Sequence, residues 1–235
     1  RPLESPYEGV KMDIKYKQQE KGYHRAALGR AVGTADCTAE EAAAWYFEYC
    51  SRERMAADRE EGNPARLEVS HKELRTNEKL YATIKKMPFL LHSREFVFKQ
   101  IWTRHEDGST RVAAWTLSDN IDYGGSLGKI VKGTSNAIFS ATNIISSSKT
   151  KQCKIQLEQY LDAGGLIPVK VMNHKLPHAL SIISSILECF QKDEEVDKAA
   201  LASLANIIKN KHQDYTDEEK AAIRKGKEFY EKCKE

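Results

Sequence analysis

The sequence predicts an α+β fold, in which a curved antiparallel sheet is gripped by a long C-terminal helix and followed by a helical tail. Segments with strand-like alternation follow one another through short turns from about residue 10 to residue 161, and short turns favour antiparallel pairing. An apolar stripe with helical spacing begins near Pro168 and predicts the long helix. Charged amphipathic segments at the end of the chain predict the tail.

Two strands open the predicted sheet, at 10–18 and 23–34. One helical region is expected next. It begins at Thr38, which is followed three residues later by Glu41, and this pair forms a capping box. The region ends in EEGNP at 60–64, because glycine and proline both break helices.

Six further strands complete the predicted sheet, at 66–74, 79–86, 95–104, 110–117, 129–144 and 150–161. The segment HEDGS at 105–109 predicts a hairpin turn, since Asp-Gly is a strong turn signal. A longer polar loop, SDNIDYGGSLG at 118–128, carries three glycines. We expect it to project from the sheet.

The long helix is predicted from apolar residues that recur at steps of three and four over about six turns. They are Val169, Met172, Leu176, Leu180, Ile183, Leu187 and Phe190. Pro168 suits the first turn of a helix. Pro177 lies inside the stripe and is expected to kink it, because proline lacks a backbone donor.

The change of composition after Gln191 divides the chain into a predicted domain at 1–191 and a C-terminal helical extension at 192–235. Within the extension, 194–211 and 216–232 have the pattern of two amphipathic helices. Because the chain begins with Arg and not Met, we expect a processed form or part of a longer protein.

Composition excludes several classes of function. The 37 basic and 34 acidic residues are interspersed, so no field of one sign favours nucleic acid. No run of 18 apolar residues occurs, so no membrane span is expected. Five scattered cysteines favour a reducing compartment. We therefore expect a cytoplasmic protein and leave peripheral membrane association open.

Three segments resemble a known family. KKMPFLLHSREFVFKQ at 85–100 resembles the strand of START (steroidogenic-acute-regulatory-related lipid-transfer) domains in which Pro-Phe precedes Arg-Asp-Phe-Val. YLDAGGLIPVKVMNHKLPHAL at 160–180 is similar to the same family's passage into its last helix. GKIVKG at 128–133 resembles the strand after its lid loop. The resemblance covers roughly residues 10–191.

The resemblance implies the helix-grip fold, of the Bet v 1-like superfamily, with an internal cavity between the sheet and the C-terminal helix. It implies non-covalent binding of one sterol, phospholipid, carotenoid or other isoprenoid by a monomer without a cofactor or nucleic acid. Transient membrane contact is left open. The loop at 118–128 and the last helix would form the gate. The gate residues are Asp122, Tyr123, Gly124 and Gly125.

Alternation along the strands, oriented by the family pattern, indicates which residues face the ligand. The predicted ligand-binding residues are Phe96, Phe98, Gln100, Trp102, Trp115, Ile155, Leu157, Gln159, Met172, Leu176, Leu180 and Ile183. A packed core without a cavity is the alternative. Gln100 and Gln159 are polar on apolar faces, so each is a candidate partner for a ligand hydroxyl or carbonyl, or bonds a neighbouring protein group.

One departure from the family concerns its sterol-type members, which commonly have an arginine at the position of Gln100 and an acid on the preceding strand. Residues 80–91 contain neither Asp nor Glu. The charged pair is therefore missing, which favours a less polar cavity or a different class of ligand.

Two other functions on the same fold stay open: a regulatory lipid sensor within a larger protein, and an enzyme of the cyclase or hydratase type. The inward faces proposed above lack Asp and Glu, which counts against general acid–base catalysis, and no catalytic residue is predicted. His174 and His178 have the spacing of metal ligands but no evident third ligand, so no metal site is expected.

Overall fold

The computed structural model describes most of the chain. It describes residues 2–3, 5, 7–16, 26–69, 77–88, 91–125, 127–145, 150–165, 167, 169–210 and 216–232. The chain forms two compact units, Arg1–Asp193 and Glu194–Glu235. The described residues of the second unit include α6 (Asp217–Lys232) and all of α5 (Asp193–Asn210) except its first residue. None of the described helices has the length and apolar run needed to cross a membrane.

The first unit is built on one sheet. Its strands are β1 (Pro2–Leu3), β2 (Lys11–Tyr16), β3 (Ala26–Ala35), β4 (Ala65–Val69), β5 (Glu78–Lys85), β6 (Ser93–Arg104), β7 (Thr110–Thr116), β8 (Ile130–Lys132), β9 (Thr134–Ile144) and β10 (Gln152–Asp162). Across the described residues they lie in the order β1-β2-β3-β10-β9-β7-β6-β5-β4, and β8 pairs with β6 off this path. The main path is antiparallel throughout, and β8 runs parallel to β6.

The single strand expected at 129–144 is in fact two strands. β8 pairs with β6, whereas β9 pairs with β7 and β10. The chain changes partners at Gly133, whose N–H donates to the Glu95 carbonyl over 2.8 Å. The alternation extends through both strands, so it does not reveal the change.

The first helical region also divides in two, as α1 (Ala39–Phe47) and α2 (Arg52–Glu60). The capping box at the start of α1 is confirmed: Thr38 Oγ1 accepts from the Glu41 N–H, and Glu41 accepts from the Thr38 N–H. A second cap, Ser51, accepts from the Arg54 N–H over 3.4 Å. A serine that caps a new helix explains the break.

The C-terminal helix has two segments, α3 (Val169–Leu180) and α4 (Ile182–Cys189). The interruption is at Ser181 and not at Pro177, which lies inside α3. Ser181 bonds the His178 carbonyl through its N–H at 3.3 Å and through its hydroxyl at 2.7 Å. This tight local turn competes with the helical pattern, and it follows the position where proline removes a donor.

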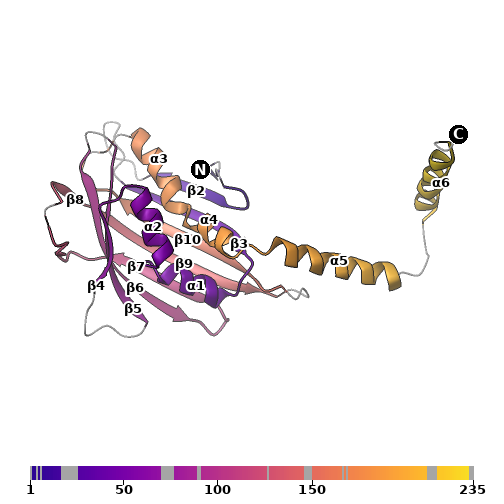
Figure 1. The fold of residues 1–235 in the computed structure, drawn as a ribbon, viewed down its shortest axis with the longest axis horizontal. Coiled ribbons are helices and arrows are strands. Elements are labelled where there is room, and N and C mark those ends of the chain that lie inside the picture. The colour runs from indigo at the N-terminus through magenta and orange to yellow at the C-terminus, as the bar shows by residue number, and fades with distance from the viewer. Residues whose placement is uncertain are drawn as a thin grey trace. The chain divides into compact units, whose positions relative to one another are not determined.

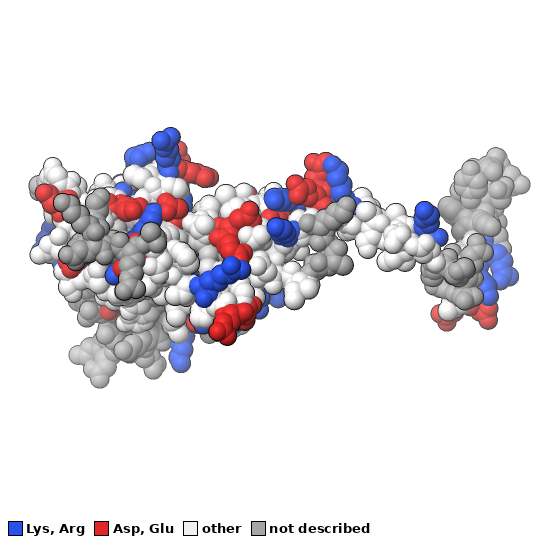
Figure 2. Space-filling view, turned by 90° about the horizontal axis from the view of Figure 1, so that it is seen from below, with Lys and Arg blue, Asp and Glu red and all other residues white. Residues whose placement is uncertain are grey.

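Helices α1 to α4 cover one face of the sheet (Figure 1). α1 lies over β7, β9 and β10, and α3 and α4 contact β3 and β10. Under α1, Tyr46 stacks on Phe139 with ring centroids 4.5 Å apart. Acidic and basic side chains are interspersed on the face shown in Figure 2, as the sequence predicts.

The C-terminal helix packs closely against two glycines of β3. A Cβ at Gly29 would lie 2.9 Å from the Leu180 side chain, and one at Gly33 would lie 3.0 Å from that of Leu187. The first distance is shorter than real Cβ contacts and the second is tighter than most of them, so a larger residue at either position would have to push the leucine side chain aside. The leucine side chains of the helix therefore pack directly on the backbone of β3 at these two glycines.

Candidate functional site

A cavity of about 600 Å³ lies between the helices and the sheet. Strands β4 to β7, β9 and β10 contribute to its lining, together with residues of all four helices α1 to α4. The volume is typical of sites that hold one small molecule. The alternative of a packed core without a cavity is therefore wrong for this part of the fold.

Four residues in register cross the bottom of the cavity. Gln100 of β6 pairs with Ala114 of β7, Ala114 with Ala137 of β9, and Ala137 with Gln159 of β10. All four line the cavity, and we call them the floor row. Neighbouring strands lie about 4.8 Å apart, so the two glutamines are roughly 14 Å apart along the sheet. The two alanines between them leave the space above open.

Aromatic and aliphatic side chains form the walls beside the floor row. Phe96 and Phe98 come from β6, and Leu157 and Leu161 come from β10. Tyr49, which follows α1, meets Phe98 edge to face with ring centroids 5.0 Å apart. These walls exclude water and suit an apolar molecule.

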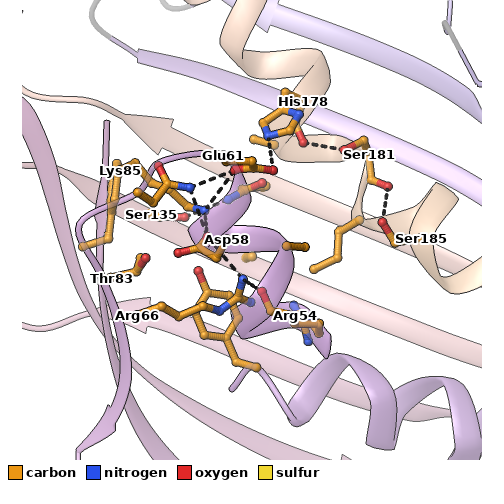
Figure 3. A pocket seen from close by; sticks show the side chains of 18 of the residues that line it. Arg54, Asp58, Glu61, Arg66, Thr83, Lys85, Ser135, His178, Ser181 and Ser185 are labelled. Carbon is orange, nitrogen blue, oxygen red and sulfur yellow. Dashed lines mark hydrogen bonds and ion pairs between the residues drawn. The ribbon is translucent and has the colours of Figure 1, made fainter. Parts of the chain in front are cut away.

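The cavity opens between α2 and the pair α3–α4. Its exposed lining residues on these helices are Glu53, Ala57, Glu61, His178, Glu188 and Cys189, which we call the mouth. Glu61 and His178 bridge it, with 3.2 Å between Glu61 Oε1 and His178 Nε2 (Figure 3). The two helices are therefore joined across the mouth by a contact that is exposed to water.

A charged network lies below the mouth. The Asp58 side chain is only 3% exposed. Its carboxylate accepts from Lys85, from Arg66 at 3.4 Å and from Asn63 at 3.2 Å. The Arg66 guanidinium also stacks on Tyr49, 3.7 Å from the ring centroid. A buried carboxylate needs such partners, so we interpret the Asp58 network as structural.

Arg54 is buried and connects α2 to the end of α1. It donates to the carbonyls of Trp45, Tyr46 and Glu48 over 3.0 to 3.3 Å. These carbonyls lack partners within α1 because they lie in its last turn. Burial, with the nearby Arg66 charge, lowers the pKa of Arg54 to about 10. The residue remains cationic at neutral pH and fixes the aromatic wall in place.

Three polar atoms of the lining are buried and have no hydrogen-bond partner among the described residues: Gln100 Oε1, Gln159 Oε1 and Arg66 Nε. The other end of the Gln159 amide donates to Ser135 Oγ over 2.9 Å. An unpaired buried polar atom costs roughly 1–3 kcal/mol. Each of these atoms has almost no accessible surface, so none of them faces the open space of the cavity as the side chains are placed.

The structure brings five of the predicted ligand residues together in the lining: Phe96, Phe98, Gln100, Leu157 and Gln159. Four others, Ile155, Leu176, Leu180 and Ile183, are fully buried in the adjoining core and do not reach the cavity. They pack the helix on the sheet. The side chain of Met172 lies outside the described residues.

Two predicted ligand residues, Trp115 and Trp102, are not among the residues that line this cavity. Trp115 is 37% exposed; it follows Ala114, which faces the cavity, so alternation points it to the opposite face. Trp102 is 39% exposed. It continues the inward face of β6 but lies near the exposed end of that strand.

The predicted gate residues do not line the cavity. Tyr123 packs with Leu80, Ala82 and Val97, which alternate with inward-facing residues and so belong to the outer face of the sheet. Its hydroxyl donates to Glu95 Oε1 over 2.9 Å. Asp122 accepts from the Gly124 N–H over 2.8 Å, and Gly125 is exposed. A gate at 118–128 stays a prediction.

Sequence reasoning missed the contribution of the first two helices. Trp45, Tyr46 and Tyr49 were visible as an aromatic cluster, and their expected role is core packing of the first helix. Tyr46 does pack on the sheet, but all three also line the cavity. No pattern in the sequence indicated that charged residues of α2 would line the cavity. Among the described residues, no group of three or more His, Cys, Asp and Glu is placed to hold a metal.

Comparisons with known proteins show the fold. No family model and no curated protein matches the sequence. Among solved structures, the human StarD13 lipid transfer and protein localization domain has a TM-score of 0.58 at 14% identity, covering 81% of this chain and 88% of that one.

Two further structures are similar. A STAR-related lipid transfer protein fragment from Xanthomonas axonopodis has a TM-score of 0.57 at 12% identity, over 82% of this chain and 98% of that one. Human StAR-related lipid transfer protein 5 has a TM-score of 0.57 at 17% identity, over 82% and 88%. The chain therefore has the START-domain, helix-grip fold, and the fold that the three segments predict is confirmed.

Proposed function

We propose that this chain binds one apolar, lipid-like molecule in the cavity and transfers or senses it without chemical change. The observation that carries the proposal is the cavity itself, with aromatic walls, a floor of alanines and amides, and an opening between two helices. The similar structures named above are described as lipid transfer proteins, which supports the same assignment.

The hydrophobic effect supplies the driving force for such binding. Burying on the order of 400–500 Å² of ligand surface contributes roughly 10–12 kcal/mol at about 25 cal/mol per Å². Lost translational and rotational freedom opposes this by several kcal/mol. The balance still permits useful affinity, provided that the polar groups of the ligand find partners in the cavity.

The placement of the carboxylates favours a carrier over an enzyme of the cyclase or hydratase type. Four of them line the cavity: Glu53, Asp58 and Glu188 come from α2 and α4, and Glu61 caps the end of α2. The lining positions on the described strands carry none. Asp58 is held by Lys85 and Arg66. A general acid or base must lie within reach of the bound molecule, and the floor offers only amides and methyl groups.

Native mass spectrometry tests the proposal. The full chain, stripped of lipid, is incubated with an extract that contains sterols, phospholipids and carotenoids. We expect one adduct per chain with the mass of a single lipid. The absence of any bound species from the whole extract would contradict the proposal.

A blocking variant ties binding to this cavity. Ala137→Phe places a ring over the floor row, so lipid binding should fall at least about tenfold, equivalent to about 1.4 kcal/mol. Ile138→Phe is the matched control, because Ile138 is the next residue and is 49% exposed on the other face. Equal binding by the two folded variants would place the ligand elsewhere.

A further inference from the structure

Two cysteine side chains lie next to each other in the core between the sheet and α1. The Sγ atoms of Cys37 and Cys153 are 3.9 Å apart, and both thiols are free. Both side chains are buried, and neither lines the cavity. The two residues are 116 positions apart in the sequence. The fold itself therefore brings the two thiols together.

Contacts on both sides of Cys37 hold it beside the start of β10. Cys153 is the second residue of β10, and Cys37 lies between β3 and α1. Asp36 accepts from the side chain of Gln152, the residue before Cys153, over 2.7 Å. Thr38, on the other side, begins the capping box of α1. The two thiols thus stay close for as long as these contacts persist.

We propose that Cys37 and Cys153 form a reversible disulfide when the protein is exposed to a peroxide, and that this bridge fastens the start of α1 to β10. The inference goes beyond the proposed function and does not depend on it. A disulfide has an S–S length of about 2.05 Å, so the sulfur atoms must approach by about 1.9 Å. Rotation of a side chain between its staggered rotamers can close a gap of this size. Residues 36–38 belong to no helix or strand, so their backbone can adjust.

The contact between the thiols prepares one of them for oxidation. When Cys153 is the thiolate, the Cys37 S–H donates to it, and this hydrogen bond lowers the pKa of Cys153. The thiolate is the reactive form of cysteine. Its sulfur attacks one oxygen of hydrogen peroxide, the O–O bond breaks, and a sulfenic acid forms while the released hydroxide takes up a proton.

The second step closes the bridge. Cys37 Sγ attacks the sulfenic sulfur of Cys153, so that the S–S bond forms and the S–O bond breaks. The departing hydroxide takes the proton of Cys37 and leaves as water. The two thiols have then lost two electrons and two protons together, and the peroxide has been reduced to two molecules of water.

Burial limits which oxidants can reach the pair. The two side chains are 1% and 0% exposed, but their neighbours in the sequence are less covered. Lys151 and Lys154 are exposed, and Asp36 is half-buried. The thiols thus lie just below the surface, where a small oxidant can reach them through a local opening. In a reducing compartment the bridge would be transient, because cellular dithiols reduce it again.

Peptide mapping of the full chain tests the proposal. The reduced protein is treated with a few equivalents of hydrogen peroxide, its remaining thiols are blocked with iodoacetamide under denaturing conditions, and its peptides are weighed. We expect one cross-linked peptide that contains Cys37 and Cys153 and is lighter by the two hydrogen atoms lost. Dithiothreitol should remove the cross-link. Cys189→Ala is the control, because Cys189 is exposed, and it should leave the cross-link unchanged.

The bridge should also stabilise the protein. A cross-link over 116 residues restricts the unfolded chain, so the oxidised form should melt about 5–10 °C above the reduced form. Cys37→Ala and Cys153→Ala remove the bridge, so peroxide should not raise their melting temperatures. If neither variant folds, the oxidised natural chain measured with and without dithiothreitol gives the same comparison.

Three results would overturn the proposal. Both thiols might stay unreacted while Cys189 is oxidised, or Cys153 might be found as a sulfinic acid or joined to a thiol other than Cys37. A Cys37–Cys153 cross-link without a rise in melting temperature would overturn the fastening of α1 to β10. None of these measurements involves a lipid, so failure of the proposed function would leave this inference standing.

Discussion

The floor and the mouth of the cavity differ in how their polar groups are satisfied. The floor row has two amides with unpaired oxygens and no charge. Near the mouth, Lys85 and Arg66 both pair with Asp58, and Glu61 pairs with His178. The protein thus pairs its charged side chains near the mouth and leaves each floor amide with one buried, unpaired oxygen.

We expect the paired charged groups to hold the fold together and the floor row to bear on what is bound. Breaking a contact near the mouth should mainly change stability or the rate of exchange. Changing the floor should mainly change what is bound. Three comparisons of variants test this separation.

The largest loss of stability is expected where α1 packs directly on the sheet, away from the cavity. Phe139 is fully buried and stacks on Tyr46, so Phe139→Ala should lower the free energy of unfolding by about 3–5 kcal/mol. Phe98 borders the cavity instead. Phe98→Ala should cost only about 2 kcal/mol, because part of its surface has no protein neighbour to lose, and should weaken lipid binding. Urea unfolding of both variants without lipid measures the difference. Equal losses would mean that the cavity is closed without a ligand.

An intermediate effect is expected at the Asp58 network. Asp58→Asn leaves Arg66 without its carboxylate partner and leaves Lys85 only Glu61, 3.8 Å away, which should lower the free energy of unfolding by about 2–3 kcal/mol. The value lies below that of a fully buried pair because the Lys85 side chain is 33% exposed. Glu53→Gln on the same helix is the control, since Glu53 is exposed. A loss of lipid discrimination without a loss of stability would make Asp58 part of the ligand site.

The smallest effect is expected at the bridge over the mouth. The side chains of Glu61 and His178 are 43% and 53% exposed, so Glu61→Gln should change the free energy of unfolding by less than about 1 kcal/mol. If the ligand passes between α2 and α3, its release should become a few-fold faster, as stopped-flow transfer to acceptor vesicles would measure. Glu60→Gln, on the neighbouring exposed position, should release at the original rate. Unchanged release in both would place the passage elsewhere, with the loop at 118–128 as the next candidate.

Most of the fold was predictable because its periodicity is strong. Alternation located β5, β6, β7 and β10 within a few residues, and the capping box located the start of α1. The breaks were harder. Ser51, Gly133 and Ser181 interrupt elements without changing the apolar pattern on either side. Local hydrogen bonds decide such breaks, and a hydrophobic pattern does not record them.

The site was predictable only along the strands. Phe96, Phe98, Gln100, Leu157 and Gln159 follow from alternation and family pattern. Trp102 does not line the cavity, because alternation gives the face of a strand but not where a cavity ends along it. Arg54, Asp58 and Arg66 were not found at all. These side chains come together only because α2 turns back over β4 and β5. No periodic pattern in the sequence indicates that arrangement.

The two glycines of β3 limit how the cavity can open. Leu180 and Leu187 occupy the spaces that side chains at Gly29 and Gly33 would fill, so the C-terminal helix cannot slide along β3 without meeting backbone or larger residues. We therefore expect the two positions to resist a shift of the helix along β3. A methyl group at position 29 or 33 would push the Leu180 or Leu187 side chain aside, so Gly29→Ala or Gly33→Ala should loosen the packing of this helix on β3.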